Sequence, residues 1–100
     1  MSIVVEDLAL GANGLSVMVK DTIDIAGYPT RASSRALADA PAAAEHAQVV
    51  AALLAAGWRV TGKTSLHELA FGTTGLNAWT GTPANPRYPG YIPGGSSSGS

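Results

Sequence analysis

The chain has 100 residues, and 46% of them are hydrophobic, enough to build a core rather than a disordered tail. Six basic residues stand against seven acidic ones, and there is no run of like charges that would attract a phosphate backbone or an anionic lipid surface. We therefore expect neither nucleic acid nor a membrane among the partners. The absence of cysteine excludes disulfides, thiolate metal ligands and a cysteine nucleophile, and we expect a cytoplasmic location.

The start of the chain does not have the pattern of a secretion signal. Residues 1–7 contain Glu6 and Asp7 but no lysine or arginine. The longest apolar run, from Val49 to Trp58, is far shorter than the roughly 20 residues that cross a bilayer. Both observations predict a soluble protein.

Residues 15–20 alternate between strongly apolar side chains (Leu15, Val17, Val19) and the others, a pattern that predicts a strand with one buried face. Residues 21–34 are rich in residues that favour turns, so we expect a loop there, with room for a second short strand at Thr22–Ile25.

A helix is predicted from an alanine-rich segment that begins near Pro41, since proline is well tolerated in the first helical turn. Apolar residues then recur at helical spacing, and Gly57 ends the pattern. Residues 58–60 follow as a short strand. A strand, a helix and a strand in this order favour parallel pairing and an α/β fold.

A further helix is predicted over Ser65–Phe71, and from Gly72 onward glycine and proline indicate irregular structure. The chain ends in GGSSSGS at Gly94–Ser100, a composition that by itself is typical of a flexible linker. Under that interpretation the chain is a noncatalytic binding or assembly fragment.

A second motif at Gly57–Thr64, GWRVTGKT, satisfies the phosphate-binding loop pattern G-x-x-x-x-G-K-[ST]. Such a loop needs a strand before its first glycine and a helix after its lysine. Here a helix precedes Gly57 and a strand is predicted inside the motif, so a nucleotide binder remains only an alternative.

Three segments in fixed order point elsewhere: GKTSLHELAFG at Gly62–Gly72, Asn85-Pro86, and the terminal GGSSSGS, with an earlier block around Val19-Lys20-Asp21. Together they resemble the amidase signature family. The resemblance implies an α/β fold, with a mixed β-sheet core flanked by helices, of which residues 1–100 would be the N-terminal portion of a single domain.

In that family a serine, a second serine after a cis peptide bond, and a lysine form the catalytic group. By motif position we expect the lysine to be Lys63 and the cis serine to be Ser96, with Ser97 as a supporting neighbour. The nucleophilic serine is expected beyond Ser100. Lys20 and Asp21 are assigned a structural ion pair or a loop anchor rather than catalysis.

The chemistry explains why these residue types are needed. A serine hydroxyl is a weak nucleophile, so a neighbouring base must accept its proton as it attacks an amide carbon. A lysine can be that base only when neutral, and burial favours the neutral amine. Ser96 would pass the proton between nucleophile and lysine, because a hydroxyl both donates and accepts.

The resemblance therefore predicts a hydrolase that converts a small-molecule carboxamide to a carboxylate and ammonia or an amine, without metal or organic cofactor. His46 and His67 lack paired metal-ligand spacing and are interpreted as surface or packing residues. The alternative within the family is an aminoacyl-tRNA amidotransferase A-subunit-like transamidase, although His67-Glu68-Leu69 favours a monofunctional amidase. Homo-oligomerisation of the full-length protein is left open, and the 100-residue chain alone is expected to be inactive.

Overall fold

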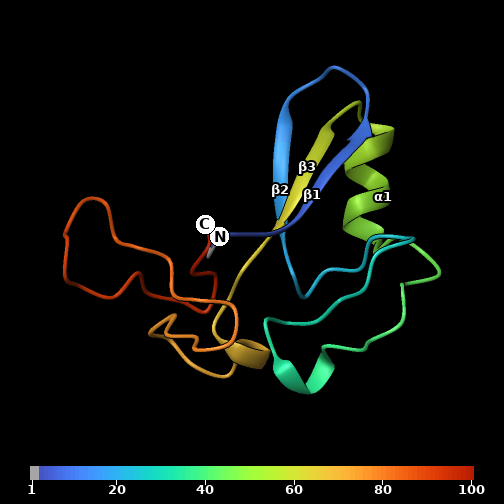
Figure 1. Cartoon of the computed structure of the whole chain (residues 1–100). Helices are drawn as coiled ribbons and strands as arrows, with labels where there is room; N and C mark the ends of the chain where they lie inside the picture. The colour runs from blue at the N-terminus through green and yellow to red at the C-terminus, as the bar shows by residue number, and fades with distance from the viewer. Residues whose placement is uncertain (1–2) are drawn as a thin grey trace.

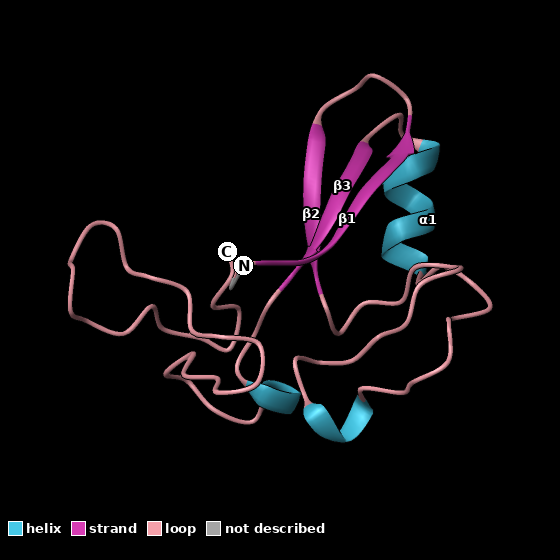
Figure 2. Ribbon diagram, in the orientation of Figure 1, coloured by secondary structure: helices cyan, strands magenta, loops and turns pink. Residues whose placement is uncertain are grey.

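The computed structural model describes residues 3–100 and contains a three-stranded mixed sheet with one helix beside it (Figures 1 and 2). The strands are β1 (Val4–Gly11), β2 (Ser16–Lys20) and β3 (Arg59–Thr64), in the spatial order β1-β3-β2. β2 pairs with β3 in parallel, whereas β1 pairs with β3 antiparallel. The α/β class and the mixed sheet expected from the sequence are confirmed.

Helix α1 (Gln48–Ala55) connects the two parallel strands and packs on one face of the sheet. The core is formed by one buried residue from each of the three strands, one from α1 and one from the loop that follows β2. These residues are Leu8, Val19, Val60, Val50 and Ile25. Gly57 ends the helix with a φ of 85°, a left-handed conformation that costs glycine little. The predicted helix stop at this residue is confirmed.

The sequence did not predict β1, although Val4–Gly11 forms the longest strand. Its exposure does not alternate regularly, since Leu8 is the only buried residue in the segment, and its register with β3 shifts twice. Without β3 beside it, such a segment carries little strand signal of its own. Pairing with another strand therefore decides this element.

Two predicted helices are wrong in extent. Residues 41–47 are not helical, because Ala42 and Ala43 form isolated β-bridges with Pro29 and Ala26, and α1 begins only at Gln48. In the segment predicted as Ser65–Phe71, a single 3-10 turn covers Glu68–Ala70.

The backbone explains why this second segment does not continue as a helix. Leu69 and Ala70 have φ values of 56° and 58°, outside the right-handed helical region. The short strand suggested at Thr22–Ile25 is likewise not formed, since these residues adopt a turn, a bend and irregular backbone.

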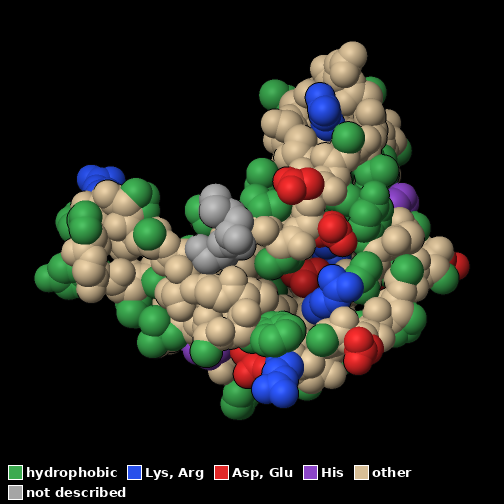
Figure 3. Space-filling model, in the orientation of Figure 1, with side chains coloured by type: hydrophobic (Ala, Val, Ile, Leu, Met, Phe, Trp, Pro, Cys, Tyr) green, Lys and Arg blue, Asp and Glu red, His purple; other side chains and the backbone are tan. Residues whose placement is uncertain are grey.

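Residues 72–100 have no helix or strand, as predicted, and extend away from the sheet as a lobe of loops (Figure 2). Apolar side chains are exposed on this lobe (Figure 3), and Trp79, Tyr88 and Tyr91 are each more than half exposed. Within residues 3–100 no helix is long and apolar enough to cross a membrane.

A substitution at Ile25 can test the packing of the core, because the Ile25 side chain is fully buried against residues of the sheet and α1. We expect Ile25→Ala to lower the free energy of unfolding by about 2–5 kcal/mol, through lost burial and the cavity it leaves. Leu15→Ala, at a side chain that is 69% exposed, should change it by less than about 0.5 kcal/mol. Urea denaturation measures both; equal effects would contradict the described core.

Candidate active site

Lys20 and Ser96 lie 76 residues apart in the sequence and are in direct contact in the structure. The amine of Lys20, at the end of β2, donates a hydrogen bond to the Ser96 hydroxyl. Both side chains are partly exposed. A primary amine hydrogen-bonded to a hydroxyl is an arrangement through which a proton can pass between the two groups.

The peptide bond between Gly95 and Ser96 is cis, as the family resemblance predicted. Two contacts hold the serine segment against the chain that follows β3. The carbonyl of Ser96 accepts a hydrogen bond from the His67 amide at 2.9 Å, and the Gly99 amide donates to the Ser65 carbonyl at 3.0 Å.

Gly75 allows the loops of this segment to approach closely. A Cβ atom placed at Gly75 would lie 2.4 Å from the Gly94 carbonyl oxygen, and the residue also has a φ of 78°. The GGSSSGS segment is thus a packed part of the structure, and its interpretation as a flexible linker is wrong.

Lys63 is fully buried and does not have the partner that the sequence predicted. Its Nζ lies 2.8 Å from Asp21 Oδ1 in an ion pair. The same amine donates to the Pro29 carbonyl at 3.2 Å and to the Thr30 hydroxyl at 3.1 Å. The lysine in contact with Ser96 is Lys20, so the structure does not bring Lys63 and Ser96 together as expected.

The register of β2 and β3 explains why Lys20, and not Lys63, contacts Ser96. Val19 pairs with Lys63, and Lys20 pairs with Thr64. Because successive side chains in a strand point to opposite faces of the sheet, Lys63 shares the face of Val19 while Lys20 points to the other face. A one-residue shift in register after the pair of Val17 and Val60 places Lys63 on the core side.

A sequence signal for Lys20 did exist. Val17 and Val19 alternate with Ser16, Met18 and Lys20, so burial of the valines leaves Lys20 on the opposite, more accessible face. The structural ion pair expected for this block is formed by Asp21, and its partner is Lys63 rather than Lys20.

Ser97, expected as a supporting neighbour, is exposed, and its carbonyl accepts a hydrogen bond from the Ser100 amide at 3.1 Å. Sequence reasoning missed Asn77, which is 7% exposed and braces the segment after β3. Its side-chain nitrogen donates to the carbonyls of Ser33 and Leu66 at 2.8 and 3.2 Å.

The two histidines accept hydrogen bonds from nearby backbone. His46 Nδ1 accepts from the Ala26 amide at 3.0 Å, and His67 Nδ1 accepts from the Gly75 amide at 3.3 Å. In the described part of the chain, no three His, Asp or Glu side chains gather closely enough to hold a metal ion.

The phosphate-loop alternative conflicts with the backbone. Residues 59–64 of the motif form strand β3, and an extended strand cannot wrap its amides around a phosphate. No helix begins directly after Thr64, since residues 65–67 are irregular. The nucleotide-binding hypothesis for Gly57–Thr64 is therefore wrong.

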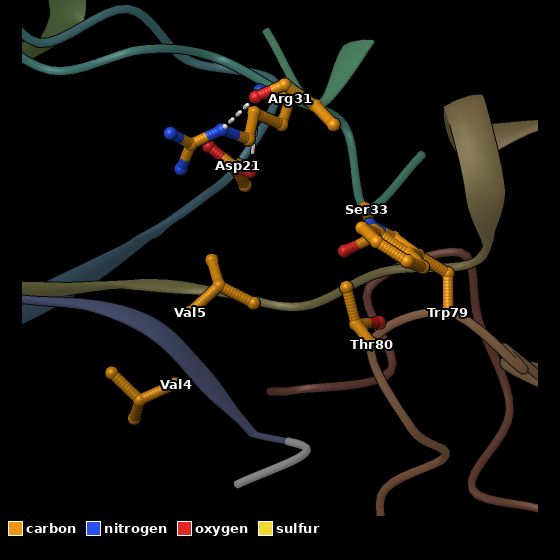
Figure 4. Close-up of a pocket in the computed structure, with 8 residues that line it drawn as sticks. Val4, Val5, Asp21, Arg31, Ser33, Trp79 and Thr80 are labelled. Carbon is orange, nitrogen blue, oxygen red and sulfur yellow. Dashed lines mark hydrogen bonds between the residues drawn. The ribbon is translucent and has the colours of Figure 1, made fainter. Parts of the chain in front are cut away.

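A cavity of about 460 Å³ opens beside Asp21, the residue after Lys20 (Figure 4). Asp21 and Arg31 lie on one side of it, and Trp79 and Thr80 lie on another. The complete lining combines polar and apolar side chains: Val4, Val5, Asp21, Arg31, Ser33, Ala38, Trp79 and Thr80.

Comparison with known proteins decides the family. The family model described as Amidase matches residues 6–100. The chain belongs to the amidase family. Amidase 1 of Oryza sativa subsp. japonica is 47% identical over 93 residues, an alignment that covers 91% of this chain and 21% of that protein.

Two further amidase-family relatives show the range of activities. A glutamyl-tRNA(Gln) amidotransferase subunit of Akkermansia muciniphila is 40% identical over 94 residues, covering 94% of this chain and 20% of that protein. The solved structure of 6-aminohexanoate cyclic dimer hydrolase superimposes with a TM-score of 0.85 at 29% identity, over 97% of this chain and 23% of that one. The chain thus spans about a fifth of the length of each of these relatives.

Proposed function

We propose that the full-length protein hydrolyses a carboxamide to a carboxylate and ammonia or an amine, with Lys20 as the base and Ser96 as the proton relay. The observation that carries this proposal is the hydrogen bond from the Lys20 amine to the Ser96 hydroxyl, formed next to a cis Gly95–Ser96 bond in a chain of the amidase family.

The proposed reaction has two stages. A nucleophilic serine beyond Ser100 attacks the amide carbon, and its proton passes through the Ser96 hydroxyl to the amine of Lys20. Protonated Lys20 returns that proton, again through Ser96, to the leaving nitrogen as the C–N bond breaks. Water then attacks the acyl-serine ester while the same pair accepts its proton, and that proton is returned to the serine oxygen as the ester bond breaks and the carboxylate is released.

Neighbouring groups fit these roles. Lys20 is partly exposed, and its amine contacts the Ser96 hydroxyl directly. The backbone of Ser96 is held by the hydrogen bond from the His67 amide to its carbonyl. Its side-chain hydroxyl is not used in that contact, so it can bond to Lys20 and to the nucleophile. The reaction needs neither metal nor organic cofactor, since a base, a relay and a nucleophile suffice.

We expect the purified full-length protein to release ammonia from small aliphatic or aryl-substituted primary carboxamides, measured by a coupled ammonia assay. The same assay with ATP added should give an unchanged rate, because the phosphate-loop motif at Gly57–Thr64 forms strand β3 and cannot wrap around a phosphate. Absence of ammonia release across such a panel, from a folded sample, would contradict the proposed hydrolase.

A second candidate is a transamidating enzyme, favoured by the 40% identity to the glutamyl-tRNA(Gln) amidotransferase subunit of Akkermansia muciniphila. A transamidating enzyme would release ammonia from glutamine and pass it to a partner that carries the acceptor. Hydrolysis of varied carboxamides by the protein alone would favour the amidase. Turnover of glutamine only, and only when partner proteins and glutamyl-tRNA are present, would favour the transamidating enzyme.

A further inference from the structure

The ion pair between Lys63 and Asp21 has no direct part in the reaction proposed above, yet it is the most deeply buried charged contact of the described residues. Lys63 is 0% exposed and Asp21 is 4% exposed. A charged pair is costly to remove from water, and it persists in a protein interior only where close geometry and further hydrogen bonds compensate.

Those further bonds are present around the amine of Lys63. Besides Asp21 it contacts the Pro29 carbonyl and the Thr30 hydroxyl, and the Thr30 hydroxyl in turn donates to Asp24 Oδ1 at 2.6 Å. One buried amine therefore links β3 to the first residue of the loop that follows β2 and to a second point further along that loop.

Asp21 is fixed at several other atoms as well. Its amide donates to the Thr64 carbonyl at 3.0 Å, and its carbonyl accepts from the Ala32 amide at 3.0 Å. Its second carboxylate oxygen accepts from the Arg31 amide at 3.3 Å. Asp21 is the residue directly after Lys20, so these contacts hold the backbone from which the Lys20 side chain starts.

We propose that the buried Lys63–Asp21 ion pair positions Lys20 against Ser96, so that Lys63 acts on the reaction through Asp21 without touching the substrate. The inference rests on the role of Lys20 in the proposed function. It follows from the opposite directions of the two lysines: Asp21 and Lys63 meet on the core side of β2 and β3, and this holds Lys20 on the other face.

The effect of losing the pair should be on turnover rather than on substrate affinity. A displacement of about 1 Å in a catalytic group can lower the rate by about 10²-fold, even when the altered residue is remote from the chemistry. In this scheme Lys63, which is 0% exposed, does not touch the substrate, and Asp21 acts by holding the backbone next to Lys20, so KM should change little.

The test uses three variants of the full-length protein: Lys63→Met, Asp21→Asn and the double variant. We expect each single variant to lower kcat by about 10- to 100-fold while KM changes by less than about twofold. The double variant should regain much of the lost thermal stability, because no unpaired charge remains buried. Its kcat should stay low, since the ion pair that connects Asp21 to β3 is still missing.

Arg59→Met is the matched control. It removes one positive charge from the same strand, β3, at an exposed side chain, and its kcat should remain within about twofold of the unaltered protein. If Lys63→Met fails to fold, Thr30→Val removes one hydrogen bond of the Lys63 amine and keeps the ion pair intact. This milder variant should still lower kcat by about threefold or more at constant KM.

Two results would overturn the inference: a folded Lys63→Met protein with kcat close to that of Arg59→Met, or, where that variant does not fold, an unchanged kcat in Thr30→Val. If Lys20→Met is inactive in the same assay, the proposed function stands and only the positioning role fails. If Lys20→Met is fully active, the proposed function itself fails.

Discussion

Lys20→Met in the full-length protein is expected to lower kcat/KM for amide hydrolysis by about 10⁴-fold, the upper end of what a positioned general base contributes. The reason is that Lys20 supplies the amine in contact with Ser96. Methionine retains an unbranched side chain of similar size but cannot accept a proton. Steady-state kinetics on a primary carboxamide, with circular dichroism to verify folding, measure the effect.

The chain offers an informative comparison, because Lys20 and Lys63 are its only lysines. Lys63→Met should lose far less activity than Lys20→Met. A small alkylamine added to Lys20→Gly should restore part of the rate, since it can occupy the space of the missing amine. If instead Lys63→Met were inactive and Lys20→Met active, the base would be Lys63, as the sequence predicted.

Ser96→Ala should lower kcat by about 10²- to 10³-fold, because it interrupts proton transfer between the nucleophile and Lys20. KM should change little, since the hydroxyl acts on a proton and not on substrate binding. The measurement is again steady-state hydrolysis of a carboxamide, with the Lys20→Met protein as the reference for lost base catalysis.

Ser97→Ala provides the control for this position. Ser97 is the next residue in the same segment, has the same side chain and is exposed. We expect its kcat to remain within about threefold of the unaltered protein. Equal losses in Ser96→Ala and Ser97→Ala would indicate damage to the segment rather than loss of a relay.

The combined effects of the two central residues should also be non-additive. Lys20 and Ser96 act on the same proton, so the Lys20→Met and Ser96→Ala double variant should be about as slow as Lys20→Met alone. If the losses multiplied, the two side chains would be acting in separate steps.

The sequence by itself determined the family and much of the fold. Motifs at Gly62–Gly72 and Gly94–Ser100 identified the amidase resemblance, which the match over residues 6–100 confirms. Alternation at residues 15–20 and the glycine at 57 located β2 and the end of α1, because strand periodicity and helix termination are local properties of the chain.

Only the tertiary structure decided which lysine meets Ser96. Two adjacent strands each present a lysine near their carboxyl ends, and strict alternation from Val60 would place Lys63 on the face that Lys20 occupies. A one-residue shift in the register of β2 and β3 moves Lys63 to the core, where Asp21 pairs with it. Register depends on how two distant segments align, so no local pattern in either one specifies it.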